Sequence, residues 1–419
     1  MEAFLILTKT HIYYIVGVHK LNINIKLNKR MKKKILLFVL LITLGLISIL
    51  LFKQRHLIWQ GLKDKRELAQ MNIAPVANYP IKTAAYWTSP TMGERDALNL
   101  ARHDLLIIDL ENKFNNRYRL LEIKKMNPDI IILAYSNPME IFTTLYQTRP
   151  WQNKVIKEIT EKRPAWLLKT VSQERQSLQF ANFWPGMIML NISATCPRIN
   201  GERYYQWMAK KLKREILSDP IFDGYFQDNG TVNISWVYQN KPEKIDINSD
   251  NQPDSDAFID KSWSKGQNRF LRSIHRYSFW RNLFRSRKML ILSNKGDTNL
   301  LKYVDGKFFE KFPNDYLGDK WAFGWGQSMS NARKTGPYTI LQVERHLLQF
   351  GLASTLLLDN AYIAVGQDNA GVFPEFEIDP GKPRGQSTSY DNLYARDYEN
   401  LRVEVNPLLQ KSTIIMYSH

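Results

Sequence analysis

The sequence has a single cysteine, Cys196, among its 419 residues. One cysteine cannot form a disulfide within the chain, and it cannot build a cysteine-ligated zinc or iron–sulfur site. A chain of this length buries enough apolar surface to fold without disulfides, so their absence is compatible with export from the cell.

Histidine is also scarce, and several catalytic motifs are missing. Only His103, His275, His346 and His419 lie beyond residue 66, and none of them forms an HxH or HExxH pattern. This disfavours a zinc hydrolase. The sequence contains no GxSxG motif, and Cys196 has no evident histidine partner, so acyl-transfer triads are poorly supported.

Acidic residues are few near the N-terminus, where most of the excess positive charge lies. The net charge of the chain is +18, of which residues 1–66 contribute +11 and the remaining residues only +7. A nucleic-acid-binding protein is expected to spread such charge over a folded face. The distribution therefore disfavours nucleic acid as a partner.

One long apolar run dominates the N-terminal region. Ile35–Phe52 comprises 18 residues without a charge, preceded by Met31-Lys32-Lys33-Lys34 and followed by no small-x-small cleavage site. About 20 apolar residues span a bilayer, whereas the apolar core of a cleaved signal is roughly 7–15 residues. We expect an uncleaved signal anchor over 31–52 that holds an exported body at the membrane. Met31 resembles a natural start, so residues 1–30 are interpreted as an upstream extension and 53–80 as a stalk.

From residue 81 to the end, short apolar runs alternate with helical stretches. Continuous apolar runs are typical of strands covered on both faces. The runs are Thr83–Trp87, Leu105–Asp109, Ile130–Tyr135, Met187–Asn191, Ile221–Asp228, Met289–Asn294, Gly306–Glu310 and Ser354–Asp359. The amphipathic stretches between them are Gly93–His103, Phe114–Met126, Gly201–Leu217, Phe258–Arg285 and Tyr338–Phe350. Eight such runs predict an α/β fold, a (β/α)₈ TIM barrel over 81–419. A doubly wound open sheet is the alternative, but no run is followed by a glycine-rich phosphate loop.

Polar residues follow these runs, where the active site of such a barrel is built. They are Asp109, Glu111, Asn137, Asn191, Asp228, Asn294, Glu310 and Asp359. Each has an alternative interpretation as a helix N-cap or loop residue. We expect Asp109, Asn137, Asn191, Asn294 and Asp359 to contact substrate. Paired carboxylates suit glycosidic bond cleavage, which needs no metal ion. Ten of the 11 tryptophans lie beyond Ile81 and could supply stacking platforms for sugars.

The segment Phe222–Asn229 reads FDGYFQDN and resembles a strand of hypothetical bacterial glycosyl hydrolases with a TIM-barrel fold, distantly similar to endo-galactosaminidases. Arg102-His103-Asp104, Asn127-Pro128, the ILSN strand end and Asp305–Pro313 occur in the same order as in that group. The resemblance covers about residues 81–370. It implies a catalytic pair formed by Asp228 and Glu310. Asp223, at the start of its strand, is interpreted as structural.

An acidic loop is inserted at 241–260. Oxygen-bearing side chains occupy every second position, with Asp246, Asn248, Asp250 and Asp254 as the candidate ligands. This spacing resembles that of EF-hand-like calcium loops, although Asn251 replaces the usual glycine and no glutamate stands at position twelve. A structural calcium ion and a solvated loop both remain open, and no other cofactor is expected.

The sequence therefore predicts a membrane-anchored, exported glycoside hydrolase that cleaves a polysaccharide by carboxylate acid/base catalysis. The alternative is a polysaccharide-binding or assembly protein on the same barrel without turnover, because a fold alone does not settle function. The distance between the carboxylates discriminates the two. Apolar neighbours around Glu310 favour the protonated form that a proton donor needs, and amide neighbours around Asp228 favour a charged carboxylate.

Overall fold

The computed structural model of the chain describes residues 3–7, 12–16, 19–22, 37, 38, 40, 41, 45, 59–172, 179–283, 287–313 and 321–418. It divides into two units, Met1–Gln60 and Gly61–His419. In the first unit, β1 (Ala3–Leu7), β2 (Ile12–Val16) and β3 (His19–Asn22) form an antiparallel sheet in that order. Most of the predicted anchor, Ile35–Phe52, lies outside the described residues. Among the helices that are described, none combines the length and apolarity needed to cross a bilayer.

The second unit begins with a helical stretch that packs on the body of the protein. Residues 61–70 are helical, and the Arg117 guanidinium donates to the Asp64 carboxylate at 2.6 Å. Leu68, Met71 and Val76 contact the main hydrophobic core. Residues 61–80, which fall in the expected stalk, are therefore part of this folded unit.

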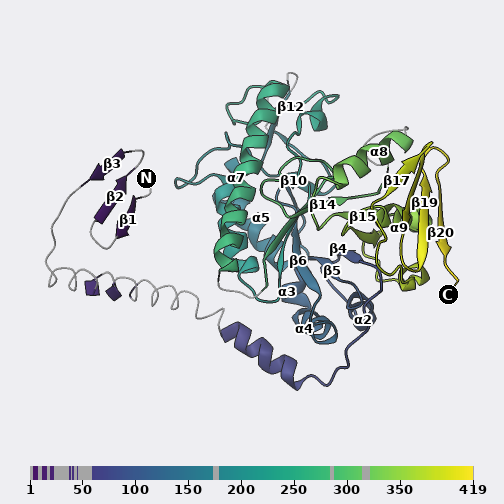
Figure 1. Ribbon diagram of the computed structural model, residues 1–419. Coiled ribbons are helices and arrows are strands. Elements are labelled where there is room, and N and C mark those ends of the chain that lie inside the picture. Colours follow the sequence, from purple (N-terminus) through teal and green to yellow (C-terminus); the bar gives the residue numbers. More distant parts are fainter. Residues whose placement is uncertain are drawn as a thin grey trace. The chain divides into compact units, whose positions relative to one another are not determined.

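Eight parallel strands form the centre of the second unit (Figure 1). In spatial and chain order they are β4 (Ala84–Trp87), β5 (Leu105–Asp109), β6 (Ile131–Ser136), β11 (Gly224–Gln227), β13 (Leu290–Asn294), β14 (Gly306–Phe309), β15 (Ile340–Val343) and β16 (Tyr362–Val365). The two edges meet, because Thr83 pairs in parallel with Ile363, whose amide donates to the Lys82 carbonyl at 3.1 Å. The predicted eight-stranded parallel barrel is thus confirmed as a nearly closed barrel.

Two of the eight runs predicted as barrel strands lie outside the barrel sheet. Met187–Asn191 contains β10 (Met187–Met189), which pairs antiparallel with β7 (Glu140–Phe142) outside the barrel. Ser354–Asp359 begins within helix α9 (Leu348–Leu356), and the predicted helix Tyr338–Phe350 contains β15. Ser354–Asp359 was predicted as a strand because α9 is buried on almost every side. A short run that is apolar all round reads equally as a buried strand.

Side chains on alternate strand positions fill the barrel interior. Tyr86, Phe226 and Phe308 form an aromatic cluster there, with ring centroids 4.8 Å apart for Tyr86–Phe308 and 5.5 Å for Phe226–Phe308. Because side chains alternate with a period of two, the residue two positions after Phe226, Asp228, and the residue two after Phe308, Glu310, continue on the inward face toward the carboxyl ends of their strands. The packed interior thus ends in polar groups at one mouth.

The strand starts at the opposite end are built by two Asp-Gly pairs. A Cβ on Gly224 would overlap the carbonyl oxygen of Leu290, so the close approach of β11 and β13 requires glycine there. The preceding Asp223 accepts the amide of Ile132 at 2.9 Å. Asp305 before Gly306 accepts the amide of Ile291 in the same way. The structural interpretation of Asp223 fits this placement.

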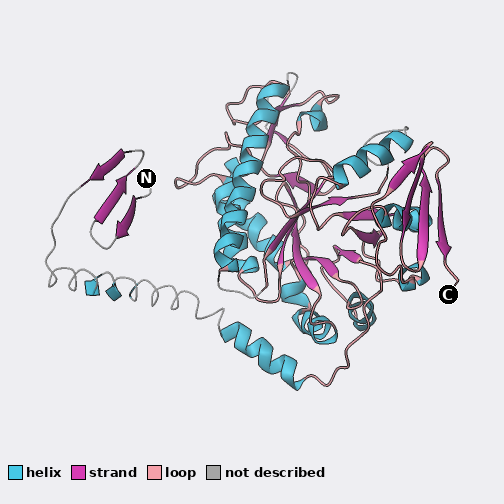
Figure 2. Cartoon of the chain, viewed as in Figure 1, coloured by secondary structure: helices cyan, strands magenta, loops and turns pink. Residues whose placement is uncertain are grey.

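Helices lie around the barrel strands (Figure 2), and two long insertions interrupt the alternation of strand and helix. The first helices are α2 (Glu94–Leu100), α3 (Asn112–Asn115) and α4 (Arg117–Met126). Between β6 and β11 lie β7, α5 (Pro150–Lys162), η1 (Pro164–Trp166), β8 (Lys169–Val171), β9 (Gln179–Phe180), β10, α6 (Tyr204–Leu212) and η2 (Lys213–Leu217). Between β11 and β13 lie η3 (Ser235–Tyr238), β12 (Lys244–Asp246) and α7 (Asp256–Asn282).

The C-terminal part adds a sheet that the sequence reading did not anticipate. After α8 (Trp321–Ala332), η4 (Arg345–Leu347), α9 and η5 (Pro374–Glu377) come four antiparallel strands. They are β17 (Thr388–Tyr390), β18 (Leu393–Asp397), β19 (Leu401–Asn406) and β20 (Lys411–Met416). Leu401, Val403 and Val405 alternate along β19 and are buried in the same core cluster as α9, which explains why that helix is apolar all round.

Candidate active site

Three polar side chains converge at the carboxyl ends of neighbouring barrel strands. Asp228 directly follows β11, Asn294 ends β13, and Glu310 directly follows β14. All three occupy the inward phase of their strands. The carboxylates are partly exposed, whereas Asn294 is only 4% exposed.

The Asn294 amide joins the two carboxylates. Its Nδ2 donates to Asp228 Oδ1 at 2.9 Å and to Glu310 Oε2 at 2.7 Å. These two oxygens are therefore at most about 5.6 Å apart, the sum of the two distances. The two N–H bonds of a planar amide diverge by roughly 120°, so well-aligned hydrogen bonds give a separation of about 5 Å.

Asp228 receives two further hydrogen bonds. The Tyr135 hydroxyl donates to Oδ2 at 2.7 Å, and the Asn229 amide donates to Oδ1 at 2.8 Å. Three donors hold the carboxylate in one orientation. The sequence reading missed Tyr135, although its position two residues before Asn137 on the inward face of β6 carried the signal.

Tyr86 lies beside this pair. Burial raises the pKa of its hydroxyl well above the ordinary value of a tyrosine, and the negative charges of Asp228 and Glu310 raise it further. Burial and the negative charge of Asp228 also raise the pKa of the Tyr135 hydroxyl. Both hydroxyls thus stay protonated and can donate hydrogen bonds at the mouth.

Asp109, at the end of β5, is held by a cation. Its Oδ2 accepts from Arg149 at 2.7 Å, and its Oδ1 accepts the Glu111 amide at 2.9 Å. Burial raises the pKa of Asp109, and the charge of Arg149 partly offsets this. Asp109 is only 1% exposed, so Arg149 presents the more accessible part of this ion pair.

Glu111 has a structural role. It is fully buried and accepts the amides of Trp151 and Gln152 at 3.0 and 2.7 Å, in the first turn of α5. A carboxylate at this position satisfies otherwise unpaired helix N–H groups. Burial raises its pKa to about 7 despite these two hydrogen bonds.

The other predicted contact residues are placed differently. Asn137 follows β6 as predicted, but its Oδ1 accepts the amides of Met139 and Glu140 in a turn. Asn191 does not end a barrel strand, and its buried amide donates to the Ile247 carbonyl at 2.8 Å. Asp359 precedes β16 instead of following it, and pairs with Arg396. Asn191 and Asp359 were assigned to the mouth because their runs were taken for barrel strands.

The acidic loop follows β12. The buried Asp246 carboxylate accepts the amides of Asp250 and Asn251 at 3.1 and 2.9 Å, and Asp254 accepts that of Ile247 at 2.7 Å. Asn248 donates to Asp250 at 2.9 Å. Within the described part of the chain, no group of three or more His, Cys, Asp or Glu side chains is arranged to hold a metal ion. Calcium binding by this loop stays a prediction.

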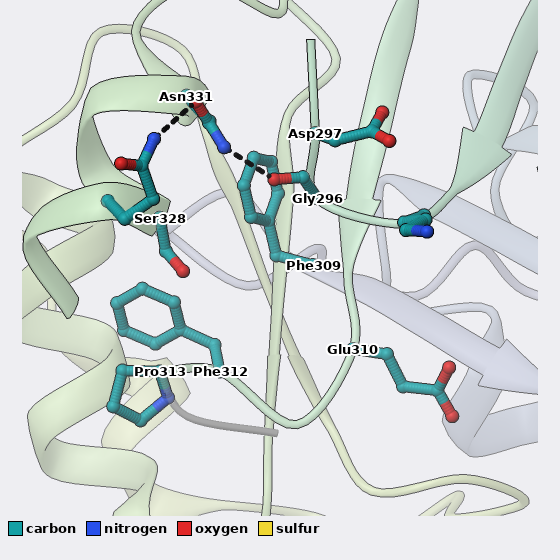
Figure 3. Close-up of a pocket in the computed structure, with 10 residues that line it drawn as sticks. Gly296, Asp297, Phe309, Glu310, Phe312, Pro313, Ser328 and Asn331 are labelled. Atoms are coloured by element: carbon teal, nitrogen blue, oxygen red, sulfur yellow. Dashed lines mark hydrogen bonds between the residues drawn. The ribbon is translucent and has the colours of Figure 1, made fainter. Parts of the chain in front are cut away.

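A pocket of about 170 Å³ lies next to Glu310, between β14 and α8. Polar side chains line one part of it, and Phe309, Phe312 and Pro313 line the other. In Figure 3 the Glu310 carboxylate points away from Phe312 and Pro313. Because Phe309 and Glu310 alternate on β14, the carboxylate faces the barrel mouth.

A parallel barrel with two carboxylates at its mouth has the parts that glycosidic bond cleavage requires, and sequence comparison identifies the family. The family described as hypothetical glycosyl hydrolase family 15 matches residues 124–402, about two thirds of the chain. The chain belongs to this family.

Three solved structures are similar to parts of this chain. The GH31 dextranase of Flavobacterium johnsoniae is 12% identical, with a TM-score of 0.42 over 72% of this chain and 39% of that one. The cycloalternan-forming enzyme of Listeria monocytogenes is 9% identical, with a TM-score of 0.40 over 71% and 30%. The GH18 chitinase of Pseudoalteromonas aurantia is 9% identical, with a TM-score of 0.32 over 68% and 94%. The chain therefore spans less than half the length of the first two. No curated protein matches the sequence.

Proposed function

We propose that this protein is a glycoside hydrolase that cleaves a polysaccharide, with Asp228 and Glu310 as its catalytic carboxylates. The observation that carries the proposal is the shared Asn294 donor, which limits the two bound oxygens to at most about 5.6 Å. Retaining glycosidases place their carboxyl groups about 5–5.5 Å apart, whereas inverting enzymes need about 6.5–9.5 Å to admit a water molecule. The geometry supports cleavage with retention of the anomeric configuration.

The hydrogen bonds around each carboxylate suggest the division of roles. Asp228 accepts from Tyr135, Asn229 and Asn294, so it serves as the charged nucleophile that attacks the anomeric carbon. Glu310 then donates its proton to the leaving glycosidic oxygen. In the second step Glu310 takes a proton from water, whose oxygen displaces Asp228 from the sugar. Both carboxyl groups return to their starting state.

Asn294 and Tyr135 act as positioning residues for this chemistry. The Asn294 amide holds one oxygen of each carboxyl group, and the Tyr135 hydroxyl fixes the oxygen of Asp228 that does not face Asn294. A nucleophile held within a fraction of an ångström of its reactive geometry avoids much of the entropy loss at the transition state.

The location of the enzyme is a separate part of the proposal. The 18 uncharged residues of Ile35–Phe52, with three lysines before them, support a membrane anchor that holds the barrel on the outer side of the membrane. An exported barrel would meet polysaccharides of the cell surface.

Chemical rescue tests the two roles. The full-length Asp228→Gly and Glu310→Gly variants are incubated with sodium azide and an aryl glycoside of the sugar that wild type cleaves. For Asp228→Gly we expect a glycosyl azide of inverted configuration, because azide replaces the nucleophile. For Glu310→Gly we expect a glycosyl azide of retained configuration, because azide attacks the covalent intermediate.

The configuration of the azide products and the rates of the variants distinguish the possible roles of the two residues. Rescue with the configurations exchanged would reverse the two roles, and near-wild-type turnover by both variants without azide would refute the pair. If wild type binds a polysaccharide but releases no reducing ends from it, the protein is the binding or assembly protein that the same fold allows.

A further inference from the structure

Two tryptophans are exposed on neighbouring segments of the insertions. Trp184, in the turn before β10, is 55% exposed, and Trp236, on η3, is 47% exposed. Phe183 lies between them, with its ring centroid 5.6 Å from that of Trp184 and 5.2 Å from that of Trp236. Both contacts are edge-to-face, at 72° and 88°. By contrast, Trp166, Trp263 and Trp325 are fully buried.

Hydrogen bonds fix the two segments to each other and to the body. The Tyr238 hydroxyl at the end of η3 accepts the Asn182 amide at 2.8 Å, next to Phe183. At the other end of η3, the Asp260 carboxylate on α7 accepts the amides of Ile234 and Ser235 at 2.9 and 3.0 Å. The aromatic group is therefore held in place before any ligand arrives, which lowers the entropy lost on binding.

Glu140 connects the aromatic group to the barrel mouth. Its Oε1 accepts the amides of Phe183 and Trp184 at 2.9 and 3.0 Å. Glu140 itself lies four residues beyond the end of β6, and its amide donates to Asn137 at the mouth. Burial raises the pKa of Glu140, and the negative charge of Asp228 acts in the same direction. Trp236 lies on the segment that leaves β11 directly after Asp228.

We infer that Trp184 and Trp236 form a platform that binds sugar rings of a glycan chain as it leaves the carboxylate pair. The inference rests on the proposed function and deepens it, because it makes the substrate a long chain instead of a short oligosaccharide. The electron-rich faces of indole rings attract the electropositive C–H bonds on one face of a pyranose. Two such rings on segments adjoining the mouth provide sugar subsites outside the point of cleavage.

Substitution of each tryptophan in the full-length chain tests the platform. The probes are dextran, glycol chitin and partly acetylated polygalactosamine, with an aryl glycoside of the cleaved sugar as the short substrate. We expect Trp184→Ala and Trp236→Ala each to raise KM for the cleaved polysaccharide about tenfold, equivalent to about 1.4 kcal/mol of binding. Their kcat, their activity on the aryl glycoside and their Tm should match wild type.

The chain offers a matched control in Trp280. It is 59% exposed on the last turns of α7, near Asn282, whose side chain accepts the amide of Met289 before the amino end of β13. It therefore lies toward the end of the barrel opposite the mouth. Trp280→Ala should leave KM and kcat for the polysaccharide, the activity on the aryl glycoside and Tm unchanged.

Affinity electrophoresis in gels containing each polysaccharide separates failure of the platform from failure of the proposed function. If wild type cleaves none of the probes but is retarded by one, and Trp184→Ala removes the retardation, the platform stands and the enzyme proposal falls. The inference is overturned if both platform variants behave as wild type, if Trp280→Ala has the same effect, or if activity on the aryl glycoside falls equally. Absence of binding and cleavage with every probe would also refute it.

Discussion

Replacing Asn294 by alanine should lower activity more than stability, because its amide joins the two catalytic carboxyl groups at the mouth. A hydrogen bond to a charged group contributes about 1.5–3 kcal/mol. Both carboxylates are partly exposed, so water can replace part of the lost stabilisation. We therefore expect a net loss of about 2 kcal/mol in transition-state binding, which is roughly a 30-fold decrease in kcat/KM.

Asn191→Ala is the matched control, since it makes the same chemical change away from the barrel strands. Asn191 is fully buried, donates to the Ile247 carbonyl at 2.8 Å and accepts the Ser193 amide at 3.2 Å. Losing both bonds should lower the free energy of unfolding by about 2 kcal/mol while the folded fraction keeps its kcat/KM.

Both variants are measured in two ways. Initial-rate kinetics on the cleaved polysaccharide give kcat/KM, and urea unfolding gives the free energy of unfolding. A kcat/KM for Asn294→Ala equal to that of wild type would remove the support that the shared donor gives to the catalytic pair. Equal losses of stability in the two variants would make Asn294 a structural residue.

Three further predictions concern other parts of the chain. Because burial raises the pKa of Glu111 from 4.5 to about 7, its contribution to stability is complete below pH 4.5 and is lost as the pH rises through 7. At about 1.4 kcal/mol per pH unit the loss is about 3 kcal/mol, and urea unfolding of Glu111→Gln should lack this slope. If the acidic loop binds calcium, the ion should raise Tm by adding about 2.7 kcal/mol at a hundred times its Kd. Asp246→Ala with Asp250→Ala should abolish that rise, and a Tm unchanged up to millimolar calcium in wild type would exclude the site. If Ile35–Phe52 is an anchor, the full chain should resist alkaline carbonate extraction from membranes, and a chain starting at Gly61 should be soluble and folded. Recovery of a mature form without this segment from cells would instead indicate a cleaved signal.

Local patterns in the sequence predicted the barrel, and the family resemblance predicted the pair of carboxylates at its mouth. Six apolar runs became barrel strands, because a strand covered on both faces must be apolar at every position. The side-chain period of two then fixed the inward phase, so a polar residue at a strand end such as Asp228, Asn294 or Glu310 had to face the mouth. The resemblance to the glycosyl hydrolase group selected Asp228 and Glu310 from this ring.

The tertiary structure alone decided which apolar runs were strands and which polar groups met. Ser354–Asp359 is rich in apolar residues because the C-terminal sheet packs on α9. No local pattern in the sequence distinguishes a helix buried in this way from a buried barrel strand. Tyr135 reaches Asp228 from another strand, 93 positions earlier in the chain, and Glu140 meets Phe183 and Trp184 across an insertion. Such contacts depend on strand register and on how the insertions fold back, which are set by long-range packing that a single sequence does not display.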